Sequence, residues 1–381
     1  MSQETSKGGL VGLPEDDFIQ RQKSGLWSLE DLAAQKNQIN NSNQPNTLLA
    51  IGQYYTTNLY LYNLFNKSLS KLNTVSTSSI RNISYNYNNS LLAISTPYLK
   101  LLNTDTLIEY NTLSIQSSII NTLSFNNTGN YLYLGLLNKN ISNTYIQVIN
   151  IEKQLNTSNI YPDININLNY LPTKIKFNNT DEYLCIGHYG SIEDEFNNIH
   201  LYRDINDEYI DITDYTLKNL KLGTITDLCF VDSLSLLFIA SFQKPYLNVY
   251  DFERQDLVTT FDREIENNIT SKINSFVLTK NGDKLLIGCD LSPYFFILDL
   301  VYNKISTPDT PVTDSTITSL SLSHNDQYLC ITDKSSTPLK VFTYIDQILE
   351  PVEIDTLVQP EQPILTSAFF FGPQGVSVDI F

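Results

Sequence analysis

The sequence predicts an all-β protein made of repeated four-stranded units, preceded by an arm of a different character. Three observations lead to this prediction. A phrase of about sixteen residues returns along the chain. Within each copy, an alternating segment, a polar turn and an apolar segment follow one another. Residues 1–45 share none of this pattern.

The repeated phrase describes two strands joined by a tight turn. Its clearest copy is "INTLSFNNTGNYLYLG", from Ile120 to Gly135. The first half alternates as a half-buried strand does, and the continuous apolar half fits a strand buried on both faces. Asn, Asp and Gly in the centre tolerate the backbone conformations of a tight turn. The other copies begin at Ile80, Pro172, Ile225, Ile273 and Ile317.

A third strand follows each phrase, as in "YLNVYDF" and "YFFILDL", and a further β-prone segment supplies a fourth. The copies start at residues 80, 120, 172, 225, 273 and 317, which places them 40 to 53 residues apart. Four-stranded units at this spacing are typical of a β-propeller.

The unit nearest the N-terminus is split between the two ends of the repeat region. Asn46 to Leu72 contains a second and a third strand without a first, and Pro363 to Gly375 matches the missing first strand and its turn. Pairing these pieces would leave no open sheet edge. We therefore expect seven blades over residues 46–375, closed by Pro363–Phe371 lying beside Thr47–Gly52, with a tail at 376–381.

The phrase resembles the strand–turn–strand repeat of the WD40 propeller family, including the Asp or Asn that follows the third strand. The resemblance implies a WD40-like propeller fold over roughly 330 residues. No unit has a Gly-His pair before its first strand or a Trp-Asp dipeptide. The hydrogen-bond network that the family builds from those residues is therefore not expected here.

Composition and charge exclude several classes of function. The net charge of −17 argues against a nucleic-acid partner. The four cysteines show neither a C-x-x-C pair nor the Cys–His spacing of a zinc site, and each adjoins an apolar strand, which indicates small buried thiols rather than a zinc site or disulfides. These cysteines are Cys185, Cys229, Cys289 and Cys330.

No catalytic constellation is evident, so we predict a protein without enzymatic activity, cofactor or metal. The histidines His188, His200 and His324 fall in strands or turns without the spacing of a catalytic triad. The acidic insert His188–Asn198 contains Glu193, Asp194 and Glu195 but no calcium-loop spacing. Asp204–Asp214 is similarly acidic and similarly unspecific.

The sequence also argues against secretion and membrane insertion. The N-terminal residues lack the apolar region of a signal peptide, and no run of 18 apolar residues occurs.

Residues 1–45 are predicted to form a flexible anchoring arm with a short helix near 28–36. Ser28 and Asp31 fit a helix start, and such a short helix needs a surface to lie against. Trp27 is the only tryptophan of the chain. We predict that it anchors a partner, because tryptophan is common at binding hot spots. The expected partner-binding residues are Trp27, Leu26, Leu29, Leu32 and Phe18.

Within this arm, Ser24 to Leu29 resembles the S-G-[VIL]-W-[ST]-L segment of tailed-phage virion proteins. The resemblance implies a structural or adaptor protein of a phage particle, in the neck, tail, baseplate or capsid, assembled in the host cytoplasm. Its partners would be other virion proteins, and copies of itself are a further option. The alternatives are a cellular WD40-like interaction scaffold, and a propeller that binds a receptor or glycan or acts as an enzyme.

Overall fold

The computed structural model describes residues 47–53, 59–64, 68–72, 80–86, 91–96, 98–104, 109–113, 115, 118–138, 144–155, 162–168, 170–190, 198–205, 208–220, 222–345, 348–352 and 364–371. The chain divides into two units, Met1–Pro45 and Asn46–Phe381, and every described residue belongs to the second. The predicted arm and its helix, with Phe18, Leu26, Trp27, Leu29 and Leu32, lie outside the described residues, as does the tail at 376–381.

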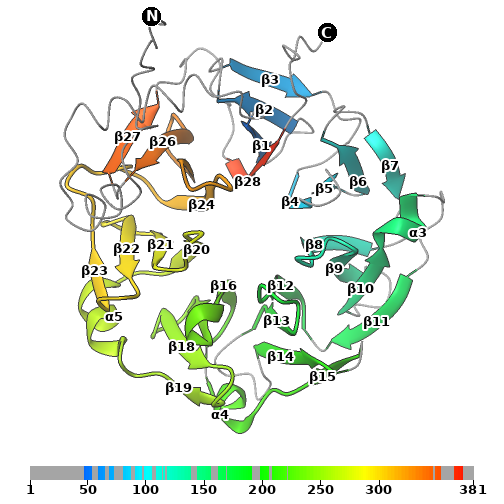
Figure 1. Cartoon of the computed structure of the whole chain (residues 1–381), viewed down its shortest axis with the longest axis horizontal. Coiled ribbons are helices and arrows are strands. Elements are labelled where there is room, and N and C mark those ends of the chain that lie inside the picture. The colour runs from blue at the N-terminus through cyan, green and yellow to red at the C-terminus, as the bar shows by residue number, and fades with distance from the viewer. Residues whose placement is uncertain are drawn as a thin grey trace, which may run out of the picture. The chain divides into compact units, whose positions relative to one another are not determined.

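The described strands form seven four-stranded antiparallel sheets arranged around a centre (Figure 1). Six of these sheets consist of four strands that are consecutive in sequence, and the remaining one combines strands from both ends of the repeat region. The prediction of an all-β propeller is confirmed. In each sheet the first strand of the repeated phrase is innermost and the fourth is outermost.

The sheet built from both ends contains, from the inside outward, β28 (Ile364–Phe371), β1 (Thr47–Gln53), β2 (Leu59–Asn63) and β3 (Ser68–Leu72). The next sheets contain β4 (Asn82–Asn86), β5 (Leu91–Ser95), β6 (Leu99–Asn103) and β7 (Glu109–Leu113), followed by β8 (Ser118–Phe125), β9 (Tyr131–Asn138), β10 (Thr144–Asn150) and β11 (Pro162–Leu168). A fourth sheet contains β12 (Pro172–Phe177), β13 (Tyr183–His188), β14 (Ile199–Asp204) and β15 (Tyr209–Asp211).

The remaining sheets contain β16 (Ile225–Val231), β17 (Leu236–Ser241), β18 (Leu247–Asp251) and β19 (Asp256–Leu257), then β20 (Ile273–Leu278), β21 (Lys284–Cys289), β22 (Phe295–Asp299) and β23 (Lys304–Ser306), and last β24 (Ile317–Leu322), β25 (Tyr328–Asp333), β26 (Leu339–Ile345) and β27 (Ile348–Val352). Short helices that the sequence did not predict lie between strands: α3 (Ile151–Leu155), η1 (Asp232–Leu234), α4 (Tyr215–Lys218) and α5 (Asp262–Asn268).

The expected pairing between the two ends of the repeat region is present. Strand β28 runs antiparallel to β1, with Thr47 opposite Phe371 and Gly52 opposite Thr366. The innermost strands also form a closed series, because β28 contacts both β4 and β24. The C-terminal strand therefore completes the sheet that lies between the first and the last of the continuous ones.

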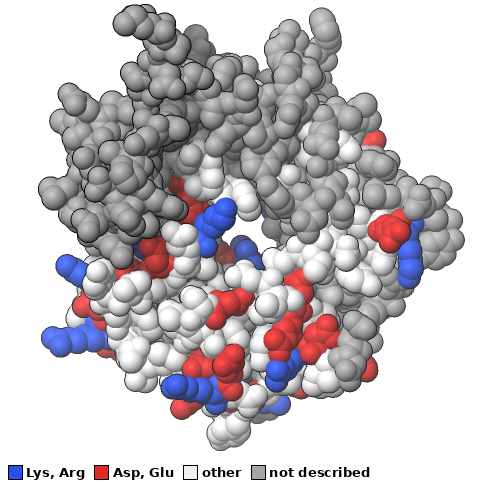
Figure 2. All heavy atoms as spheres, viewed as in Figure 1, with Lys and Arg blue, Asp and Glu red and all other residues white. Residues whose placement is uncertain are grey.

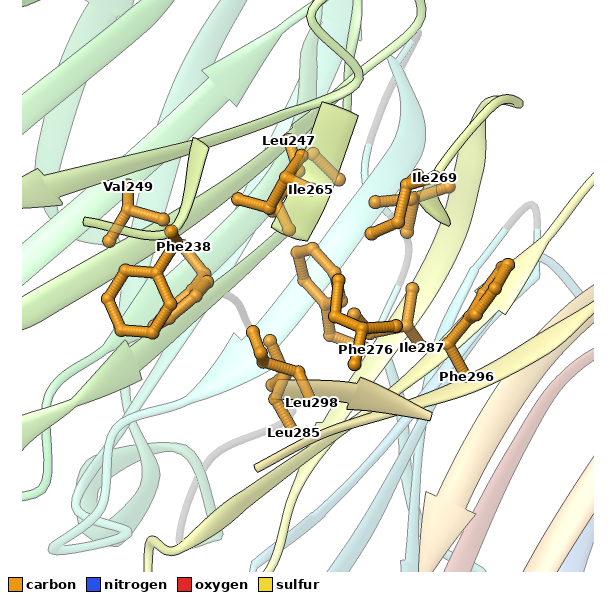
Figure 3. Packing of buried hydrophobic residues seen from close by; sticks show 14 of the residues in the cluster. Phe238, Leu247, Val249, Ile265, Ile269, Phe276, Leu285, Ile287, Phe296 and Leu298 are labelled. Carbon is orange, nitrogen blue, oxygen red and sulfur yellow. The ribbon is translucent and has the colours of Figure 1, made fainter. Parts of the chain in front are cut away.

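Apolar clusters hold the neighbouring sheets together. The structure contains seven such clusters among its described residues, and each lies between two adjacent sheets. Figure 3 shows the largest, in which Phe238 of β17 and Phe276 of β20 face a shared core that Ile265 of α5 covers. The continuous apolar half of the repeated phrase is buried on both faces because it supplies two of these clusters at once.

The glycine that ends several copies of the phrase is explained by close packing between sheets. A Cβ atom on Gly187 would lie 2.5 Å from Ile225 Cγ2, and one on Gly288 would lie 2.6 Å from Ile317 Cγ2. Ile225 and Ile317 are the first residues of the inner strands that follow. These glycines therefore leave room for the next sheet.

Polar side chains along the inner strands link each sheet to the next. In three sheets the second residue of the inner strand donates a hydrogen bond to the first backbone carbonyl of the next inner strand: Thr226 Oγ1 to Ile273 O at 2.6 Å, Asn274 Nδ2 to Ile317 O at 2.9 Å and Thr173 Oγ1 to Ile225 O at 2.8 Å. Asn82 and Asn121, at other positions of their inner strands, donate to Asn121 O and Pro172 O of the strands that follow. This series provides an inter-sheet connection in a chain that lacks the Trp-Asp and Gly-His motifs.

Candidate partner-binding surface

The antiparallel sheets give the propeller two faces with different connections. We call the end that carries the links between second and third strands the loop face, and the opposite end, which carries the links between first and second and between third and fourth strands, the turn face. The segments that lead from each outer strand to the next inner strand also finish at the loop face, because strand direction alternates within a sheet. A binding surface on either face would be held by rigid strands.

Large apolar side chains are exposed on four loops of the loop face. Tyr98 is 41% exposed, Tyr189 62%, Phe242 52% and Leu291 61%. Each follows the end of a second strand by one to three residues. Single exposed apolar residues are common on soluble proteins, and these four stand out because they occupy matching positions of one face.

Two of these residues belong to a locally cationic patch, formed by Phe242, Lys244, Lys272 and Leu291, that we call the Phe242 patch. Lys272 Nζ lies 4.9 Å from the centroid of the Phe242 ring and 3.9 Å from Asp290 Oδ1. Lys244 Nζ lies 5.8 Å from the ring of Tyr246. These contacts place ammonium groups against aromatic faces, an arrangement that is attractive in partly exposed sites.

Backbone contacts fix the loops of the Phe242 patch. The N–H of Phe242 donates to Thr224 O at 2.8 Å, and the N–H of Leu291 donates to Ser271 Oγ at 3.2 Å. Thr316 Oγ1 donates to Asp290 O at 2.9 Å and so ties the loop to the next sheet. The apolar side chains are therefore presented from a prearranged backbone, which lowers the entropy cost of binding.

Charge on the propeller is mixed rather than uniformly negative. On the face that Figure 2 shows, basic side chains lie beside the centre of the ring, and acidic side chains lie to the left of them and below them in this view. Among the inner strands, Lys174 Nζ lies 3.5 Å from Oδ1 of the buried Asp227. The other oxygen of Asp227 accepts a hydrogen bond from Phe276 N at 2.7 Å. This carboxylate thus contacts the sheets on both of its sides.

Two of the three histidines lie close together beneath the loop face. The rings of His188 and His200 are perpendicular, with centroids 5.1 Å apart, and His200 Nδ1 lies 3.2 Å from Asp211 Oδ2. Burial, with the charge of His200, lowers the pKa of His188 to about 3 against the weaker opposing effect of the Tyr170 backbone. Although burial alone would raise it, hydrogen bonds from His200 and Thr213 hold the pKa of Asp211 at about 2.

This histidine pair does not form a recognisable reaction centre. His188 is buried with neither ring nitrogen in a hydrogen bond of ordinary geometry. His324 lies apart from the pair, on an exposed turn between β24 and β25. No group of three or more His, Cys, Asp or Glu within the described part of the chain is arranged to hold a metal ion. Residues 191–197 of the acidic insert, with Glu193, Asp194 and Glu195, lie outside the described residues.

The cysteines lie in or beside the strands, as the sequence indicated. All four are free thiols, and Cys185, Cys289 and Cys330 are buried. Burial raises the pKa of the Cys229 and Cys289 thiols to about 12, so neither is poised as a nucleophile.

The structure adds a surface that the sequence interpretation missed. The residues predicted to bind a partner all belong to the arm, outside the described residues, whereas Phe242 and Leu291 were not singled out. A signal was available in the loops "SFQKPY" and "CDLSPY", which place an apolar residue and a Pro-Tyr pair after a second strand. Among the described residues, no helix is long and apolar enough to cross a membrane.

Comparison with known proteins identifies the fold. No protein-family model and no curated protein matches the chain. Among solved structures, it is similar to a chain in the crystal structure of the mitotic checkpoint complex, with 13% identity, a TM-score of 0.55, and coverage of 76% of this chain and 80% of that one. It is also similar to the β-propeller domain of Cps50 (Swd1) from Myceliophteria thermophila, with 11% identity, a TM-score of 0.51, and coverage of 79% and 88%.

These neighbours establish a WD40-like β-propeller fold. At such identities a likeness speaks for the fold alone, and 1324 solved chains match, so shape does not select one function. Neither neighbour is a phage protein by its description, and the comparisons give no support to the virion interpretation of the arm.

Proposed function

We propose that this chain is a non-enzymatic protein-interaction scaffold, in which the WD40-like propeller is a rigid disc and the loop face receives a partner protein. The observation that carries the proposal is the Phe242 patch, where Phe242 and Leu291 are exposed on backbone-fixed loops beside Lys244 and Lys272. The fold of the solved neighbours supports such a scaffold better than it supports a virion component.

The chemistry of the patch indicates what it would bind. Aromatic and aliphatic side chains next to ammonium groups suit a segment that combines an apolar side chain with carboxylates. Of the two lysines, Lys272 has a carboxylate beside it, Asp290 at 3.9 Å, and both lie on a chain whose net charge is −17. The patch is therefore a local exception to an acidic protein, and an acidic peptide segment is the partner that it favours.

A charge-introducing variant tests this proposal. Phe242→Glu together with Leu291→Glu should reduce, at least tenfold, the amount of partner protein that the full chain retains from an extract of its source cells. The exposed Ser336 lies on the corresponding loop between β25 and β26, so Ser336→Glu is the matched control and should retain the partner. Equal retention by the double variant, at an unchanged melting temperature, would refute the loop face as the binding surface.

We further propose that the arm supplies a second anchor, with Trp27 at its centre and Leu26, Leu29, Leu32 and Phe18 around it. A tryptophan carries about 150–250 Å² of burial surface, which favours a bound state over exposure. Trp27→Ala should leave the melting temperature unchanged and weaken assembly by about 2 kcal/mol or more. Because Trp27 is the only indole, a blue-shifted emission in the isolated protein would show that the arm docks on its own chain and contradict this role.

A further inference from the structure

The turn face carries two adjacent apolar side chains that are largely exposed. Val301 is 71% exposed and Tyr302 80%. Both lie at the tip of the turn between β22 and β23. We call this pair the Val301–Tyr302 tip. It lies at the opposite end of the sheet from Leu291, which belongs to the loop face.

The turn that presents this tip is firmly held. Asp299 Oδ1 accepts hydrogen bonds from the N–H groups of Val301 at 3.0 Å and Tyr302 at 2.9 Å. Asn303 adopts a φ of 52°, and its Nδ2 donates to Thr260 O at 2.6 Å. Leu300, the residue before the tip, is buried in the core between sheets. The two exposed side chains are therefore fixed at their backbone on both sides.

The neighbouring sheet contains the same turn with a different tip. Between β18 and β19, Asp251 Oδ1 accepts from the N–H groups of Glu253 at 3.0 Å and Arg254 at 2.8 Å. Gln255 adopts a φ of 59°, and Phe252 before the tip is buried, as Leu300 is. This turn forms with Glu-Arg where the other has Val-Tyr, so the fold does not require an apolar tip.

We propose that the Val301–Tyr302 tip is a second docking element, which inserts into an apolar pocket on a partner protein with a basic surface. Exposed apolar area that the turn does not need for its own geometry is a liability in water unless it is covered in an assembly. A tyrosine with a fixed backbone is also a favoured hot-spot residue, because it buries a large area at low entropy cost.

Charge around the tip favours a basic partner. Helix α5 contacts β23 and carries Asp262, Glu264 and Glu266 against one cation, Arg263, and the exposed Lys304 of β23 adds a second cation, so acidic groups remain in excess. Glu264 Oε2 lies 3.4 Å from the N–H of Ile305 in β23, which places a carboxylate beside this turn. A second copy of a chain with a net charge of −17 and an anionic membrane would both be repelled.

This inference does not rest on the proposed loop-face function. The Phe242 patch and the Val301–Tyr302 tip lie at opposite ends of the strands, so two different partners can bind at the same time. The propeller would then act as a bridge between an acidic segment on its loop face and a basic protein on its turn face.

The test transplants the neighbouring tip. The full chain with Val301→Glu and Tyr302→Arg should keep the melting temperature of the wild type, because the same turn carries Glu253 and Arg254 next to it. Proteins retained by the wild type from source-cell extract are compared with those retained by this variant and by the control Glu253→Ala with Arg254→Ala. A protein that the wild type and the control retain, but the variant with the transplanted tip does not, is then purified. Its affinity is measured by direct titration against the wild type, the variant and the control.

We expect a basic protein whose affinity falls at least 30-fold with the transplanted tip, is unchanged in the control, and is unchanged by Phe242→Glu with Leu291→Glu. If the transplanted tip lowers the melting temperature, Tyr302→Ser alone should show the same selective loss. The proposal is overturned if the variant with the transplanted tip retains every protein that the wild type retains. It is also overturned if the control, or Phe242→Glu with Leu291→Glu, loses the same protein to the same extent. It is equally overturned if the tip instead controls sedimentation with phosphatidylcholine–phosphatidylserine vesicles or dimerisation in sedimentation equilibrium.

Discussion

His188 is buried with its ring edge against His200, and this environment keeps it neutral. Burial lowers its pKa in the folded protein to about 3, whereas in an unfolded chain a histidine titrates near 6.5. Between these values the unfolded state binds more protons than the folded state. The free energy of unfolding must therefore decrease as the pH falls from about 6.5 towards 3.

Replacement of His188 by Gln should remove this pH dependence. In the wild type, urea unfolding between pH 6.5 and 4.5 should show a loss of about 1.4 kcal/mol per pH unit in the lower part of the window. Asp211 contributes only at lower pH, because hydrogen bonds hold its folded pKa at about 2 and its stabilisation is lost below the unfolded value near 3.9. His324 lies on an exposed turn, so His324→Gln should keep most of the change in the free energy of unfolding with pH. If His188→Gln kept the same change as the wild type, His188 would not be its source.

Exposure of individual apolar residues was harder to predict than burial. Leu300 and Val301 are adjacent and chemically alike, yet one is in the core and the other is exposed, because the turn reverses the chain between them. Periodicity predicts a buried strand well but does not assign residues within a turn. Aligning "DFERQD" with "DLVYNK" would have revealed the unusual tip, since the two segments share the Asp at the start and a residue with positive φ near the end.

At the level of elements, the tight turns between first and second strands also join neighbouring sheets. Asp181 lies in the turn after β12 with a φ of 61°. Its carboxylate accepts hydrogen bonds from the N–H groups of Asn127 at 2.7 Å and Thr128 at 2.9 Å, both in the turn of the preceding sheet. Asp326 similarly accepts from Lys280 N at 2.6 Å. The Asn, Asp and Gly of the repeated phrase thus do more than permit a turn.

Two substitutions at Asp181 separate these contributions. Asp181→Ala removes these two hydrogen bonds, together with those that the side-chain amides of Asn126 and Asn127 donate to the same carboxylate, and keeps a side chain at positive φ. Unfolding should therefore require about 2–4 kcal/mol less. Asp181→Gly also removes the hydrogen bonds but relieves the backbone conformation, so its loss should be about 1 kcal/mol smaller. Both values come from urea unfolding. Equal destabilisation of the two variants would show that the positive φ of residue 181 costs no free energy. If neither variant were destabilised, the hydrogen bonds of Asp181 to the preceding sheet would not contribute to stability.

Elements outside the repeated phrase were the least predictable. Helix α5 was missed because its seven residues show no helical period, and the burial of Ile265 depends on tertiary packing against the two sheets that the helix connects. The inner strands were predictable because six copies reinforce one pattern. The Gly at the end of the phrase was visible as a repeated residue. The need for it was not, because it depends on a tertiary contact with the Ile of the next sheet.

At the level of the whole molecule, closure depends on a sheet shared by the two ends of the repeat region. Side chains of β1 and β2 contribute to apolar clusters on both sides of this sheet. Leu49, Ile51 and Tyr62 pack with Val341 of β26, and Ala50, Leu59 and Leu61 pack with Ile94 of β5. The incomplete N-terminal unit therefore occupies a place between two complete sheets, and β28 supplies its inner edge.

Removal of residues 363–381 should open this ring. Strand β1 would lose its pairing with β28 along Thr47–Gln53 and present an unpaired edge, which is a template for aggregation. The contacts of β28 with β4 and β24 would also be lost, so two more inner strands would lose a neighbour. We expect the truncated chain to aggregate, or to melt at a distinctly lower temperature in differential scanning calorimetry.

Removal of residues 373–381 alone leaves β28 complete and should change the melting temperature little. A truncation at 363 that stays monomeric in sedimentation velocity and melts like the wild type would show that the C-terminal strand does not close the propeller.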